Sequence, residues 1–168
     1  MVLVTAILAW LHILSAIGWL GGGIMFAFVV GPALRTLSPP SSGEFLVKVV
    51  PKVVRFFRIS AGGTVLFGLL FLYSFSGGDF SILSFSTHLG AELTIGVSIG
   101  LIAFLTAEFV AAPRQVKAVN VIKEMMAAGQ HQPPADFPRT LKRAADSALV
   151  TVILLILTSV FMVASGFY

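Results

Sequence analysis

The run VLVTAILAWLHILSAIGWLGGGIMFAFVVGPAL, Val2 to Leu34, contains one ionisable side chain, His12, and no charge before Arg35. A helix needs about 20 mostly apolar residues to cross the hydrocarbon core of a bilayer, so this run is long enough to span it. The 168-residue chain is 57% hydrophobic and only 11% charged. Ordinary soluble domains are about 25% charged. The sequence therefore predicts an integral protein of the lipid bilayer.

Four stretches are long and apolar enough to be spans: about residues 2–34, 59–76, 82–112 and 145–167. Backbone polar groups in hydrocarbon must be satisfied internally, which helices and closed barrels achieve. The connections are short enough to join neighbouring helices. We therefore expect a single all-α domain over residues 1–168, folded as an integral membrane antiparallel four-helix bundle.

The segments beside the spans carry local signals. Residues 44–58 have an amphipathic pattern that leads into the second span, and we expect Pro51 to interrupt this approach. The third span is expected to continue as a helix past Pro113 and to end at Gly129. The first and third spans are longer than a bilayer requires, so we expect them to tilt or to project from it.

All eleven Lys and Arg residues lie between spans one and two or between spans three and four. They are Arg35, Lys48, Lys52, Arg55, Arg58, Arg114, Lys117, Lys123, Arg139, Lys142 and Arg143. Cytoplasmic loops are enriched in such residues, so the sequence predicts a multi-pass protein of the cell membrane with both basic loops cytoplasmic and both termini outside. Topology also explains the net charge of +4, and no nucleic-acid module is present.

Two histidines and two glutamates, His12, His88, Glu92 and Glu108, lie within the predicted spans. An ionisable group in a span is costly enough to be a functional hypothesis by default. Counting back from the next basic residue of each span at a rise of 1.5 Å puts His12 and His88 about 4 to 5 Å apart in depth.

Two histidines at similar depth on different helices are a known way to hold haem b. On this interpretation His12 and His88 are the metal ligands, and Trp19 and Phe85 form walls of the site. The competing interpretation is that His12 only hydrogen-bonds to a neighbouring helix and holds the bundle together.

The carboxylates allow several roles. Glu92 can hydrogen-bond a ligating histidine, move protons or bind substrate, or pack as a neutral acid against a serine. Glu108 lies about four turns nearer the cytoplasmic side and can reach Arg55, Arg58 or Arg143. We therefore expect Glu108 to form a structural ion pair.

The segment HILSAIGWLGG, from His12 to Gly22, with VVGPALR closing the helix, resembles the first helix of the membrane domain of copper-resistance protein D and its relatives. Its His and Trp spacing is also similar to that of the small membrane protoporphyrinogen oxidases of the HemJ type. The latter resemblance implies haem b bound by His12 and removal of hydrogen from protoporphyrinogen. That family has a lysine near the position of Glu92, so the glutamate here counts against the same reaction. The former resemblance implies metal transport or tolerance.

With no cysteine in the chain, any redox role requires a bound cofactor. The sequence predicts a membrane protein that binds haem b and takes part in electron transfer, as a small haem-dependent oxidoreductase or a subunit of a larger redox complex. Its partners would be a quinone or a redox protein, or further copies of the chain. The alternatives are a transport or resistance protein for copper or another metal ion without haem, and a structural partner whose histidines only join helices.

Overall fold

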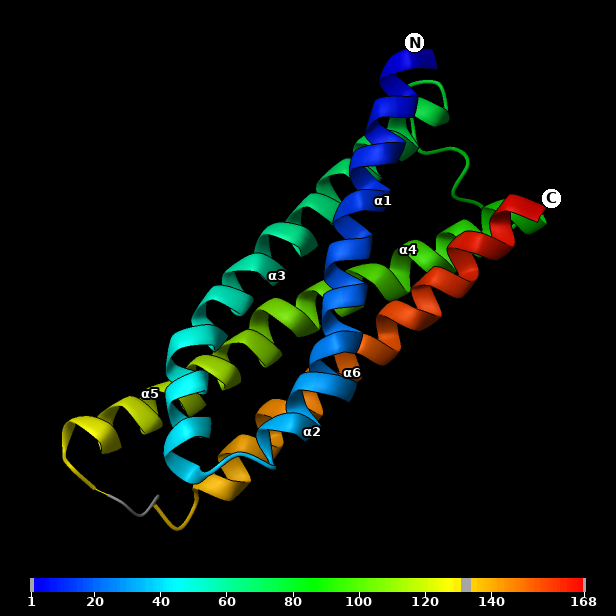
Figure 1. Cartoon of the computed structure of the whole chain (residues 1–168). Helices are drawn as coiled ribbons and strands as arrows, with labels where there is room; N and C mark the ends of the chain where they lie inside the picture. Colours follow the sequence, from blue (N-terminus) through cyan, green and yellow to red (C-terminus); the bar gives the residue numbers. More distant parts are fainter. Residues whose placement is uncertain (1, 131–133, 168) are drawn as a thin grey trace.

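The structure is a computed structural model that describes residues 2–130 and 134–167. These residues contain helices and no strand, and four helical stretches are long and apolar enough to cross a membrane (Figure 1). The stretches are Val2–Leu34, Pro39–Phe75, His88–Ala127 and Phe137–Ala164. The elements in chain order are α1 (Val2–Met25), η1 (Phe26–Val30), α2 (Gly31–Leu34), α3 (Pro39–Phe75), α4 (His88–Thr106), η2 (Ala107–Ala111), α5 (Ala112–Ala127), α6 (Phe137–Ala164) and η3 (Ser165–Phe167).

Two of the stretches contain a widened π-helical turn just before a proline. In η1 the N–H of Gly31 donates to the carbonyl of Phe26, and Pro32 follows. In η2 the N–H of Ala112 donates to the carbonyl of Ala107, with Pro113 next. Proline has no N–H, and its ring collides with the carbonyl four residues earlier. The extra residue in each turn lets the helix continue past the proline, so the third span runs through Pro113 as expected.

The helix α3 is longer than the predicted second span. It begins with Pro39 and Pro40 directly after Ser38, a position where a missing N–H costs no helical hydrogen bond. It then continues through Pro51 to Phe75, so the expected interruption at this proline is wrong. The apolar second span is therefore the second half of one long helix.

Helix α4 begins later than the hydropathy pattern predicts. Residues 82–87 are non-helical, and Thr87 is the N-cap, its Oγ1 accepting a hydrogen bond of 3.0 Å from the N–H of Gly90. The expectation that the span starts at Ile82 is wrong. His88 is the first residue of the helix, and Phe85 does not share a helical face with it.

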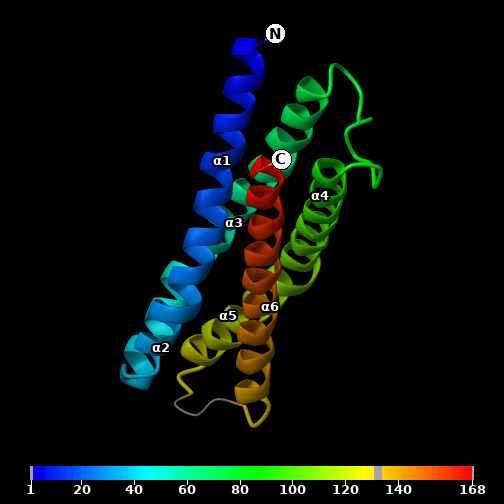
Figure 2. The same cartoon turned by 90° about the vertical axis from the view of Figure 1, so that its right-hand side faces the viewer.

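The long stretches associate mainly as two pairs, α1 with α3 and α4 with α6 (Figures 1 and 2). The pairs meet at a cluster of buried side chains that takes one residue from each long stretch: Trp19, Ala61, Ala103 and Leu155. We call this the core cluster. Most of the basic residues lie at the end of the molecule formed by α2, α5 and the starts of α3 and α6, which we call the basic end, whereas Arg58 lies midway along α3.

Candidate functional site

The imidazole of His12 lies against α3. Its Nδ1 is 2.8 Å from the carbonyl oxygen of Thr64, one helix away. A carbonyl oxygen only accepts hydrogen bonds, so Nδ1 is the donor, and the tautomer that makes this contact has its lone pair on Nε2. Gly68 makes room for the ring, since a β-carbon there would be 2.7 Å from Nδ1. The contact fixes both the tautomer and the orientation of His12.

Small residues below His12 belong to the same contact between α1 and α3. A β-carbon at Gly63 would lie 2.7 Å from Oγ of Ser15, and one at Gly18 would lie 3.1 Å from Oγ of Ser60. Such residues let two membrane helices approach closely. The small residues around His12 are therefore used in helix packing.

Trp19 is in the core cluster. Its side chain is buried and meets the ring of Phe104 edge to face, with 6.5 Å between the ring centroids. It therefore holds the two helix pairs together, and it forms the end wall of a cavity described below.

His88 and Phe85 lie away from His12. Phe85 is 73% exposed in the loop before α4, and His88 is exposed at the start of that helix. Trp19 and Ala103 mark one level in the core cluster. At a rise of 1.5 Å per residue, His12 lies about 10 Å from Trp19 along α1, and His88 lies about 22 Å from Ala103 along α4. The path along the helix from the core cluster is therefore about 12 Å longer to His88 than to His12, and the two histidines belong to different helix pairs.

Glu92 belongs to the other helix pair. It lies one turn before Gly96, where a β-carbon would be 3.2 Å from the side chain of Met162 on α6, so Glu92 is on the face of α4 toward α6. Its Oε2 is buried and has no hydrogen-bond partner in the part of the chain that the structure describes. Glu92 and His12 thus face different neighbours.

Glu108 forms an ion pair, as its position in the sequence predicted. Its partner is Arg58, one of the three arginines that the sequence placed within reach. Oε2 of Glu108 lies 3.0 Å from Nε of Arg58, and their side chains are 21% and 52% exposed. Both residues are within two turns of the core cluster, which lies midway along the apolar stretches. The charged pair is therefore deep within the apolar part of the molecule, on the side toward the basic end.

A cavity of about 370 Å³ extends from the core cluster toward the basic end, and we call it the central cavity. Trp19 and Leu155 bound it at one end, and Arg35 and Leu141 at the other. Its walls are mostly small or branched apolar side chains, among them Gly23, Val50, Val54, Ala111, Ala118 and Val152. Arg58 and Glu108 also line it. Sequence reasoning missed this cavity, although alanines cluster in the segments that form its walls.

The same ion pair also faces a second, shallower hollow between α3 and the α4–η2 stretch. Gly62, Phe104 and Phe109 complete its lining, and Phe109 is 73% exposed. We call it the lateral hollow. Arg58 and Glu108 are thus the charged side chains shared by the two spaces.

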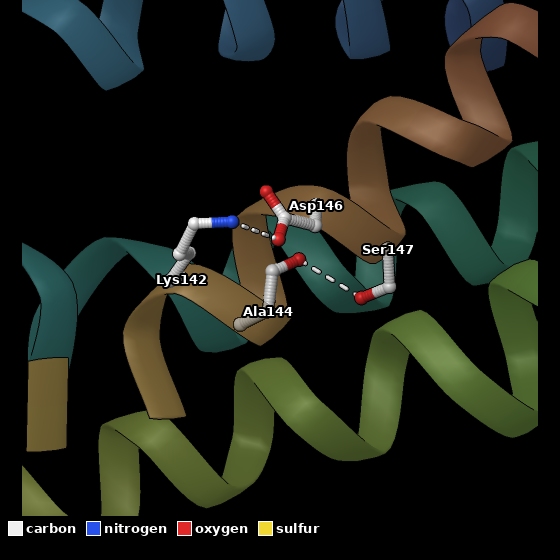
Figure 3. A network of polar contacts seen from close by, with 4 residues as sticks. All are labelled: Lys142, Ala144, Asp146 and Ser147. Carbon is white, nitrogen blue, oxygen red and sulfur yellow. Dashed lines mark hydrogen bonds and ion pairs between the residues drawn. The ribbon is translucent and has the colours of Figure 1, made fainter. Parts of the chain in front are cut away.

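Near the mouth of the central cavity, the first turns of α6 carry their own polar contacts (Figure 3). Nζ of Lys142 lies 2.8 Å from Oδ2 of Asp146, and Oγ of Ser147 donates to the carbonyl of Ala144 at 2.9 Å. Asp146 lines the cavity, and its charge is compensated by the ion pair with Lys142.

No protein-family model, curated protein or solved structure matches this chain. Within residues 2–130 and 134–167, no three His, Cys, Asp or Glu side chains are grouped so that they could hold a metal ion.

Proposed function

We propose that the chain is an antiparallel four-helix bundle of the cell membrane that binds haem b through His12 and takes part in electron transfer. It would act as a small oxidoreductase or as a subunit of a redox complex. The proposed orientation has both basic loops in the cytoplasm and both termini outside, because the basic residues gather at one end of the molecule.

The observation that supports haem binding is the contact between Nδ1 of His12 and the carbonyl of Thr64. Metal-ligating histidines commonly donate their second ring N–H to a backbone carbonyl or a carboxylate, which orients the ring and raises the basicity of the free nitrogen. His12 has this arrangement, with Nε2 as the free nitrogen. When bound, haem b supplies one-electron redox chemistry.

His12 is proposed as the protein ligand without His88, because His88 is exposed at the start of α4 and lies about 12 Å farther from the core cluster along its helix than His12 does along α1. Trp19 is proposed to seal the inner side of the site as part of the core cluster. Phe85 is too exposed in its loop to wall a site at His12. Glu92 keeps its proposed role in hydrogen bonding or proton transfer only for a group between α4 and α6.

The test is the absorption spectrum of the detergent-purified protein, oxidised and then reduced with dithionite, for the wild type and a His12→Asn variant. Asparagine keeps an N–H that can donate to the Thr64 carbonyl, so it preserves much of the contact with α3 while removing the imidazole. We expect the wild type to show a Soret band and, after reduction, the single broad visible band of haem with one histidine ligand, and we expect the variant to lose both bands. Copper without porphyrin, or bands that persist in His12→Asn, would reject the proposal.

A further inference from the structure

The Arg58–Glu108 pair occupies an unusual place for a structural ion pair. It borders two spaces, the central cavity and the lateral hollow, and both side chains line both spaces. An ionisable group inside a span is a functional-site hypothesis by default. Glu108 also lies in the π-helical turn η2, and such turns are frequent at functional sites.

The walls around the pair indicate the character of a ligand. The central cavity is bounded mainly by apolar side chains, with Trp19 at its inner end. The lateral hollow lies between two membrane-spanning stretches and is lined by Phe104, Phe109 and Gly62. A molecule that reaches the pair through this hollow comes from the hydrocarbon of the bilayer, so it must be lipid-soluble.

The pair also indicates the chemistry of the ligand's polar end. Arg58 offers N–H donors, of which the contact with Glu108 uses Nε, and the Glu108 carboxylate offers acceptors. The two charges compensate each other, and Arg35 lies at the other end of the cavity, so a second full charge at the pair finds no excess of the opposite sign beside it. A neutral head that accepts from Arg58 and donates to Glu108 suits this site better than a carboxylate or phosphate.

We propose that the central cavity binds the head of an isoprenoid quinone or quinol at Arg58 and Glu108, with its chain leaving through the lateral hollow. A quinone carbonyl accepts hydrogen bonds from Arg58, and a quinol hydroxyl donates to Glu108. The choice of a quinone rests on the proposed electron-transfer function, but its binding is measured without reference to haem.

The chain provides its own reporter for this site. It has two tryptophans, and Trp19 lines the central cavity whereas Trp10 is 66% exposed on α1. A Trp10→Phe protein therefore has Trp19 as its sole tryptophan. Quinones quench indole fluorescence at close range, so titrating this protein in nanodiscs with a quinone that carries a ten-carbon chain reports occupancy of the cavity.

We expect saturable quenching of Trp19, with Kd raised about tenfold or more in Arg58→Gln, since hydrogen bonds to a charged group are worth that much. The control is Lys48→Gln, which removes an exposed lysine that is paired with Glu44 and lines neither space. Quenching that rises linearly with quinone, or that saturates equally in Arg58→Gln, overturns the proposal.

A second variant tests the route and is built to fold. At Gly62 a β-carbon meets nothing within 4 Å, so Gly62→Leu extends into the lateral hollow without a backbone clash. We expect it to abolish saturable quenching. The matched control is Gly21→Leu, whose β-carbon is equally unobstructed but which lines neither space.

Two further measurements separate the competing outcomes. A brominated fatty acid that quenches Trp19 more tightly than the quinone would overturn the proposal in favour of an anionic lipid. A His12→Asn protein without haem bands should still bind the quinone, because His12 lines neither space. A protein that binds the quinone but no haem contradicts only the proposed haem function. A protein that binds haem but not the quinone contradicts only the proposed quinone site.

Discussion

Gly68 lies directly against the imidazole of His12: a β-carbon at this glycine would be 2.7 Å from Nδ1 and 2.8 Å from Cε1. The hydrogen bond from His12 to Thr64 exists because this position has no side chain. The orientation of the candidate ligand is therefore determined by a residue on the opposite helix.

Replacing Gly68 by alanine should displace the His12 ring and separate α1 from α3. Overpacking of this kind costs about 1 to 3 kcal/mol of unfolding free energy. The measurement is unfolding in mixed detergent micelles, followed by circular dichroism. Gly62→Ala is the control, because its β-carbon meets nothing within 4 Å and alanine favours the helix. Equal stability of the two variants would mean that the ring does not pack against Gly68 as described.

The His88→Ala variant separates one histidine ligand from two. Since His88 is exposed at the start of α4, in the other helix pair from His12, we expect its removal to leave the Soret and visible bands of a haem-loaded protein unchanged. The reduced spectrum at room temperature is sufficient for this comparison. Sharp reduced α and β bands in the wild type that become broad in His88→Ala would instead restore His88 as a second haem ligand.

The first helical stretch and the position of Glu108 followed from the sequence more closely than the rest. Val2–Leu34 coincides with the predicted first span because it is continuously apolar and ends at Arg35. The partner of Glu108 was one of three arginines, since helical rise fixes a level along the chain but not which neighbour faces it.

Other features depend on how helices meet, which hydropathy does not encode. The loop before α4 contains Ile82, Leu83 and Phe85, so its composition is that of a span, and only the cap at Thr87 marks the true start. The predicted depths of His12 and His88 were counted from Arg35 and Arg114. That count assumes that the two arginines lie at the same height in the membrane. The central cavity lies between alanine-rich segments of the two helix pairs. It depends on how the helices pack against each other, so the hydropathy pattern could not predict it.

The Arg58–Glu108 pair should be worth more than the exposed pairs of this chain. We expect Glu108→Gln to lower the unfolding free energy by about 1 kcal/mol, discounted because Arg58 is 52% exposed. Adding Arg58→Gln should recover part of the loss, since it removes the cation left without its partner. A double-mutant cycle measures this coupling, and the same cycle at Lys48 and Glu44, 70% and 57% exposed, should give about 0 to 0.5 kcal/mol. Equal couplings in the two cycles would contradict the deep placement of the pair.

The buried oxygen of Glu92 predicts a stabilising substitution. Its Oε2 accepts no hydrogen bond within the described residues, and a buried acceptor without a partner costs about 1 to 3 kcal/mol. Glu92→Met, which keeps the length of the side chain and removes the carboxylate, should therefore raise the midpoint of thermal unfolding. A lowered midpoint would show that the carboxylate has a stabilising partner, such as a bound water.

The orientation of the chain can be read with single cysteines, because the native sequence contains none. Ser81 lies in the exposed connection between α3 and α4, and Gln130 is exposed just after α5 at the basic end. If both basic loops are cytoplasmic, a membrane-impermeant maleimide should label Ser81→Cys in intact cells, whereas Gln130→Cys should react only after permeabilisation. The opposite pattern would invert the topology and place the central cavity on the outer side. Because the cavity extends toward the basic end, this labelling also decides from which side of the membrane its mouth is reached.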